Sequence, residues 1–142
     1  MDFLVDTNIL SELRKRTRAD ARVRQWREEI DGDQLFLSVL SIGEIRQGIE
    51  NIRLRDPSQA AALERWLERT LENYRGRILD VNAAIADRWG RLSPRQPQPF
   101  VDGFIAATAL EYGMTVATRN TSHFVRSGVP VVNPFLHGEA HD

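Results

Sequence analysis

The chain contains no cysteine among its 142 residues. That absence excludes a disulfide-stabilised scaffold, thiol catalysis and cysteine-based zinc sites, and it makes a reducing cytoplasm the expected compartment. Long apolar runs are also missing: none approaches the roughly 18 residues of a membrane-spanning helix, and the N-terminus lacks a secretory signal pattern. We therefore expect a cytoplasmic protein that does not associate with a membrane.

Lysine is nearly absent as well, because Lys15 is the only lysine among 19 basic residues. The formal net charge of −1 counts against a protein held on nucleic acid by its overall field. Residues 14–27 are nevertheless locally basic, since only Asp20 opposes their arginines and lysine. This arginine excess reflects either the base composition of the genome or recognition of phosphate and carboxylate groups, which the planar guanidinium suits.

Short apolar runs alternate with helical patterns along the chain. The runs predict strands over residues 3–5, 35–37, 78–81, 115–117 and 131–132, and the patterns predict helices over residues 8–15, 23–30, 42–52, 58–74, 83–92 and 102–112. Because parallel strands need crossover connections, the alternation predicts an α/β fold with a mainly parallel sheet between helices. We expect one domain over residues 1–136, a proline-rich loop over residues 93–99 and a frayed tail over residues 137–142.

Three acidic residues stand out, because ligands of such folds bind beyond the C-terminal ends of the strands. Asp6 directly follows the first strand, and Asp102 opens a helix of small and apolar residues. Glu44 lies near the start of a mostly apolar helix. Each residue has an alternative interpretation as a helix cap: Asp6 and Asp102 as N-caps, and Glu44 as the acid of a capping box begun by Ser41.

Asn120 closes the fourth strand, so polar residues from four elements are expected at one edge of the sheet. Clustered carboxylates repel one another unless a cation neutralises them, and oxygen ligands favour Mg²⁺ or Mn²⁺. Such an ion polarises phosphoryl oxygens and activates water. The pattern therefore predicts metal-dependent hydrolysis of a phosphodiester. Acyl transfer and nucleotide-binding loops have less support, because no serine lies in a nucleophile-elbow motif and no glycine-rich loop follows a strand.

Four segments, in order and in register from residue 3 to residue 135, resemble the motifs of PIN-domain proteins. The segments are LVDTN at residues 4–8, SVLSIGEIRQGI at residues 38–49, FVDGFIAATAL at residues 100–110, and TRNTSHF at residues 118–124 with Asn133-Pro134 downstream. More specifically, the chain resembles VapC-type toxins of bacterial toxin–antitoxin pairs, on their FitB-like branch.

The resemblance implies a three-layer α/β/α sandwich, PIN-like, with a five-stranded sheet and a Mg²⁺-dependent endoribonuclease site that could also use Mn²⁺. Asp6 and Asp102 would bind the metal directly. Glu44 and Asn120 would act on it through water, as further catalytic residues. The hydroxyls of Thr7 and Ser41 would contact these residues and orient them, without binding the metal.

Two residues depart from the family pattern. Asn120 stands where many relatives carry an acid, and His123 replaces an aspartate before Phe124. An amide and an imidazole supply less negative charge than two carboxylates, so we expect one bound ion rather than two. Whether His123 takes part in the site is left open by the residues alone.

The resemblance also implies partners: a cognate VapB/FitA-type antitoxin, an RNA substrate, a second copy of the chain in a homodimer, and operator DNA only through the antitoxin. Arg14, Arg18 and Arg22 would contact RNA or the antitoxin, unless this basic stretch is simply a solvated helix face. Two functions stay open. One is a toxin that cleaves tRNA or another structured RNA and arrests growth. The other is a catalytically weak module that serves as the dimerising co-repressor of a DNA-binding antitoxin.

Overall fold

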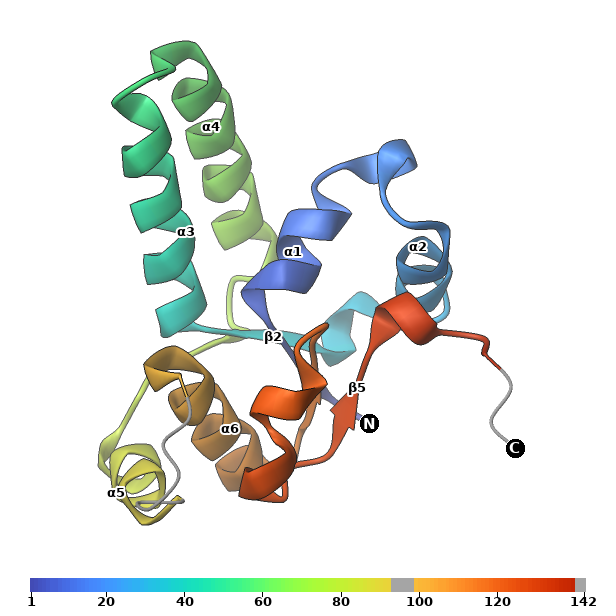
Figure 1. The fold of residues 1–142 in the computed structure, drawn as a ribbon, viewed down its shortest axis with the longest axis vertical. Coiled ribbons are helices and arrows are strands. Elements are labelled where there is room, and N and C mark those ends of the chain that lie inside the picture. The colour runs from blue at the N-terminus through green and yellow to red at the C-terminus, as the bar shows by residue number, and fades with distance from the viewer. Residues whose placement is uncertain (93–98, 140–142) are drawn as a thin grey trace.

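A five-stranded parallel sheet forms the centre of the computed structural model, which describes residues 1–92 and 99–139 (Figure 1). The strand order is β3-β2-β1-β4-β5, and every pairing is parallel. The strands are β1 (Phe3–Val5), β2 (Leu35–Ser38), β3 (Ile78–Leu79), β4 (Thr115–Ala117) and β5 (Val131–Val132). The predicted parallel sheet is confirmed, whereas the proline-rich loop lies outside the described residues apart from Pro99.

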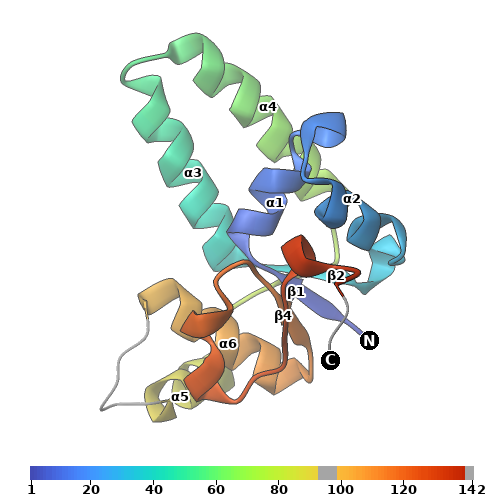
Figure 2. The ribbon, with the colours of Figure 1, turned by 45° about the vertical axis from the view of Figure 1, so that its right-hand side comes forward.

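Helices cover both faces of the sheet. They are α1 (Thr7–Leu13), α2 (Ala21–Glu28), α3 (Val39–Arg53), α4 (Pro57–Asn73), α5 (Ala83–Arg91) and α6 (Phe100–Tyr112), joined in part by the 3₁₀ turns η1 (Arg16–Arg18), η2 (Gly32–Gln34), η3 (Thr121–His123), η4 (Val125–Ser127) and η5 (Pro134–Leu136). Helices α1 to α4 lie on one side and α5 with α6 on the other (Figure 2). No helix in the described part of the chain is long and apolar enough to cross a membrane.

Alternate side chains of β1 supply the two cores, as the pleat of a strand requires. Phe3 and Val5 pack with α1 to α4, whereas Leu4 packs with α6. On the outer side of α6, Phe104 stacks on Trp89 of α5 with ring centroids 4.5 Å apart. The predicted three-layer sandwich is therefore confirmed.

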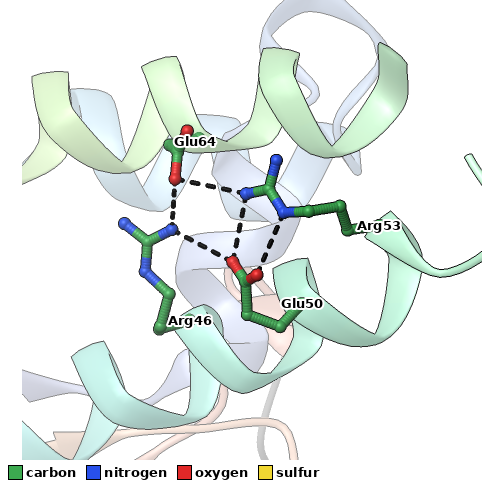
Figure 3. Close-up of polar contacts among 4 residues, drawn as sticks. All are labelled: Arg46, Glu50, Arg53 and Glu64. Atoms are coloured by element: carbon green, nitrogen blue, oxygen red, sulfur yellow. Dashed lines mark hydrogen bonds and ion pairs between the residues drawn. The ribbon is translucent and has the colours of Figure 1, made fainter. Parts of the chain in front are cut away.

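Helices α3 and α4 form a hairpin that rises away from the sheet (Figure 1). Four charged residues connect its two arms outside the apolar core (Figure 3). Arg46 and Arg53 of α3 both donate to Glu64 of α4, and Glu50 accepts from the same two arginines. These side chains are partly exposed, so we expect each pair to contribute little and the network to fix the spacing of the two arms.

The start of the predicted C-terminal tail is attached to the domain. His137 Nε2 donates to Glu29 Oε2 at 2.5 Å, and Arg22 Nη1 donates to the His137 carbonyl at 2.8 Å. These contacts hold the segment after η5 against α2, at Arg22 in its first turn and at Glu29 after its last residue. The prediction of a frayed tail is therefore wrong for His137, while residues 140–142 lie outside the described part.

Candidate active site at the strand ends

The strand order reverses between β1 and β4. After β1, the chain adds β2 and β3 on one side of the sheet, and then adds β4 and β5 on the other side of β1. In open α/β sheets, ligands bind at such a point, beyond the C-terminal ends of the strands. Asp6 follows β1 there and is only 3% exposed. Its Oδ1 accepts from the Thr7 amide at 2.8 Å, so the carboxylate also serves as the N-cap of α1. The capping interpretation holds, but it accounts for only one of the two oxygens.

The second oxygen of Asp6 is held by Thr118, a residue that the sequence did not single out. Thr118 directly follows β4, is completely buried, and donates its hydroxyl to Asp6 Oδ2 at 2.8 Å. The same hydroxyl accepts from the Asn120 amide at 3.0 Å and from Asn8 Nδ2 at 3.4 Å. Asn8 Nδ2 also reaches Asp6 Oδ2 at 3.3 Å. Thr118 therefore joins the ends of β1 and β4 and fixes the Asp6 carboxylate.

Glu44 is placed differently from the capping-box hypothesis. Helix α3 begins at Val39 and is capped by Ser38, whose hydroxyl accepts from the Leu40 amide at 3.1 Å. Glu44 lies further along the helix, exposed, and its Oε1 accepts from the Thr7 hydroxyl at 2.8 Å. The capping-box interpretation is wrong, because β2 already ends in a serine that caps the helix.

Ser41 is completely buried in α3. Its hydroxyl has no hydrogen-bond partner within the described part of the chain. The predicted supporting role of Thr7 thus agrees with its hydrogen bond to Glu44, whereas the supporting role of Ser41 remains a prediction.

Asp102 lies in the first turn of α6, not at its cap. The helix begins at Phe100 with Pro99 as N-cap residue, so the interpretation of Asp102 as the N-cap is wrong. Its side chain is 14% exposed, and its Oδ2 accepts from His123 Nδ1 at 2.6 Å. A carboxylate can only accept, so this contact assigns the proton to Nδ1 of the imidazole. His123 therefore belongs to the site, and Asn120 lies exposed at its rim.

The charges of Asp102 and Glu44 act on the carboxyl group of Asp6. Burial raises the pKa of the Asp6 carboxyl above 3.8, and the hydrogen bond from Thr118 opposes that effect. The negative charges of Asp102 and Glu44 raise the pKa of Asp6 further, although α3 and α6 are far apart in the sequence. A bound cation would relieve this repulsion.

The donor set fits a hydrated divalent ion. Among the described residues, no three His, Asp or Glu side chains gather closely enough to form an all-protein metal cage. Mg²⁺ does not need such a cage, since it keeps several waters and is bound through one or two carboxylates. Asp6 and Asp102 have the oxygen chemistry to supply those two ligands.

The basic residues predicted as contacts have different surroundings. Arg14 caps the end of α1 and lies over the Trp66 ring at 5.9 Å. Arg18 is exposed on η1. The Arg22 guanidinium donates a hydrogen bond to the His137 carbonyl. Only Arg14 of these three lines the groove that begins at Thr7 and Glu44.

A PIN-domain family model matches residues 3–128. The chain belongs to the PIN-domain family. It is 31% identical to toxin FitB of Neisseria gonorrhoeae over 138 residues, which cover 94% of this chain and 98% of FitB. It is also 31% identical to VapC ribonuclease Y4jK of Sinorhizobium fredii over 139 residues, covering 94% and 97% of the two chains. The resemblance to VapC-type toxins of the FitB-like branch is thus confirmed.

Solved structures agree with this assignment. The PIN-domain chain superposes on FitAB bound to an IR36 DNA fragment with a TM-score of 0.84 and 32% identity, covering 99% of each chain. It superposes on FitAcB from Neisseria gonorrhoeae with a TM-score of 0.82 and 31% identity, covering 94% and 98%. This PIN-domain protein is therefore homologous, over nearly its whole length, to toxins solved within toxin–antitoxin complexes.

Proposed function

We propose that this protein is the Mg²⁺-dependent endoribonuclease toxin of a toxin–antitoxin module. It hydrolyses phosphodiester bonds of tRNA or another structured RNA and arrests growth until its antitoxin binds. One observation carries the proposal: the buried Asp6 carboxylate, at the reversal point of the sheet, lies in the field of both Asp102 and Glu44. The homology to a VapC ribonuclease supports the same chemistry.

Each side chain has a part in this activity. Asp6 and Asp102 would hold the ion, which when bound polarises the phosphoryl group and stabilises the leaving oxygen. Thr118 keeps Asp6 in place, and His123 does the same for Asp102. Glu44 has one oxygen engaged by Thr7, so its other oxygen can accept a hydrogen bond from the attacking water and orient it.

Asn120 would add an amide at the exposed rim, where it can bind water or an RNA oxygen. Its neutral side chain supports occupancy by one ion rather than two.

An antitoxin of the VapB/FitA type is the expected partner, because the similar chains were solved in FitAB complexes. We expect contact with operator DNA only through that antitoxin, and a homodimer of the toxin.

The DNA-bound FitAB complex also favours a second candidate function, a catalytically weak co-repressor. Asp102→Asn separates the two: it should abolish cleavage and leave antitoxin binding and operator binding intact.

Removal of divalent metal tests the proposed activity. Purified protein is incubated with labelled tRNA and with total RNA, and the products are resolved on a denaturing gel. We expect EDTA to stop cleavage, and excess Mg²⁺ or Mn²⁺ to restore it. Without a cation, the negatively charged carboxylates repel the scissile phosphate. Undiminished cleavage in EDTA would contradict metal dependence. Sequencing of the RNA ends after induction would identify the bond that is cleaved.

His123→Ala should lower cleavage about 10–100-fold, as is typical when a group that orients a metal ligand is removed. His123→Asn keeps an N–H donor near Asp102 and should recover part of the loss. Steady-state kinetics and Mn²⁺ affinity by titration calorimetry measure the effect.

His137→Ala is the matched control, since it also removes an imidazole paired with a carboxylate, but that carboxylate is Glu29 and not one of the three acids of the site. Equal activity and Mn²⁺ affinity in the His123→Ala and His137→Ala proteins would count against the positioning role.

A further inference from the structure

A cavity of about 260 Å³ lies among α1, α2 and α4, next to the start of β2. Three arginines line it: Arg14 from the end of α1, Arg27 from α2 and Arg77 from the segment before β3. No Asp or Glu of the described residues lines this arginine cavity. It therefore concentrates positive charge in a protein whose net charge is −1.

The backbone holds two of these guanidinium groups in place. Arg77 donates to three backbone carbonyls at 2.5–2.6 Å, and Arg27 donates to the Ile30 carbonyl at 3.1 Å. Neither these two arginines nor Arg14 has an ion-pair partner in the part of the chain that the structure describes. The cavity is thus preorganised, and its charge is not neutralised by a carboxylate.

Aromatic rings complete the lining. Arg77 lies over the Tyr74 ring at 4.8 Å, and Arg14 lies over Trp66. Burial raises the pKa of the Tyr74 phenol, while the charges of Arg27 and Arg77 act in the opposite direction. Guanidinium forks and a neutral phenol are hydrogen-bond donors suited to an anion with several oxygens.

A groove of about 210 Å³ includes Thr7 and Glu44 of the acidic site in its lining and shares Arg14 and Trp66 with the arginine cavity. Most of its other lining residues are apolar. Helix α1 runs along the same path, and its seven residues span about 10 Å. A nucleic-acid strand with one phosphate at the acids can therefore place another phosphate at the arginines.

We propose that the arginine cavity binds a backbone phosphate of the RNA strand whose scissile bond lies at Asp6 and Asp102. This inference rests on the proposed function and identifies the path of its substrate. The placement of the acids at the start of α1 and of Arg14 at its end favours RNA over a carboxylate of a protein partner, because one strand satisfies both the acidic site and the arginine cavity. It also explains how a protein without excess positive charge holds RNA.

The salt dependence of RNA binding tests this proposal. All proteins carry Asp102→Asn, and the probe is a fluorescein-labelled single-stranded RNA of mixed sequence, followed by anisotropy over a range of salt concentrations. Arg14→Gln and Arg27→Gln should each weaken binding and reduce the slope of log K against log salt by up to about 0.7, the value for complete loss of one phosphate contact in a single strand. Arg14→Lys, which keeps the charge, should retain the slope.

Arg55→Gln is the matched control, because Arg55 is an exposed arginine that lines neither the arginine cavity nor the groove. Its slope should not change, and circular dichroism checks that every variant is folded. Equal slopes for the Arg14, Arg27 and Arg55 variants would overturn the proposal. Arginine-dependent binding of polyglutamate without an effect on RNA would overturn it in favour of an acidic protein partner. Cleavage by Asp102→Asn protein at the wild-type rate would instead contradict the proposed function itself.

Discussion

Asp102→Asn is expected to lower RNA cleavage at least about a hundredfold, because loss of a group that merely orients a metal ligand already costs about 10–100-fold. The amide keeps the shape of the side chain and an oxygen that can accept from His123, so the change removes chiefly the negative charge. Asp6→Asn should have the same effect on cleavage. Growth arrest after induction should disappear with both variants.

Asp33→Asn provides the control for both substitutions. Asp33 is exposed on η2, before the start of β2, so it lies near the opposite edge of the sheet. Its variant should cleave RNA and arrest growth as the unsubstituted protein does. Wild-type cleavage by either the Asp6 or the Asp102 variant would rule out the assigned site.

Asp6→Asn should also stabilise the metal-free protein, by about 0.5–2 kcal/mol as is common for a single stabilising substitution. The pKa of Asp6 is raised in the folded state, so its protonated form favours folding at low pH and that contribution is lost as the pH rises through the folded-state pKa. The gain from the amide should therefore be absent in acid and complete at neutral pH. Urea unfolding in EDTA at both pH values measures it, and a gain of equal size at acidic and neutral pH would contradict the electrostatic cause.

The sequence predicted the sheet and its acids because these depend on local patterns. Short apolar runs bounded by polar residues specify the strands, and the strand ends place Asp6 at the edge where ligands bind.

The positions of the helix caps were less predictable. The Ser41–Glu44 spacing suits a capping box, yet Ser38 ends β2 and caps α3 first. Similarly, Pro99 with its fixed φ permits α6 to begin before Asp102.

Contacts between distant segments could not be derived from one sequence. Nothing in the local pattern distinguishes Thr118 from any other threonine after a strand, and its role follows from the pairing of β1 with β4. The arginine cavity is similar. Arg14 and Arg27 belong to the recognisable basic stretch, but Arg77 joins them only because the segment before β3 returns beside η2.

Thr118→Val is expected to impair both stability and catalysis. Valine has nearly the same shape, but it cannot donate to Asp6 or accept from the Asn120 amide. Loss of a buried hydrogen bond to a charged group destabilises by about 1–3 kcal/mol, and loss of an orienting group lowers activity about 10–100-fold. Thermal unfolding and cleavage rates measure the two effects.

The pH profile of cleavage distinguishes this role from a general loss of packing. The Thr118 hydrogen bond holds the pKa of Asp6 down against burial and against the charges of Asp102 and Glu44. Its removal should therefore raise that pKa further and move the acidic limb of the rate profile to higher pH. Thr118→Ser retains the hydroxyl and should return the limb to its original position. A limb that does not move in the valine variant, or that moves equally in the serine variant, would show that the hydroxyl does not control Asp6.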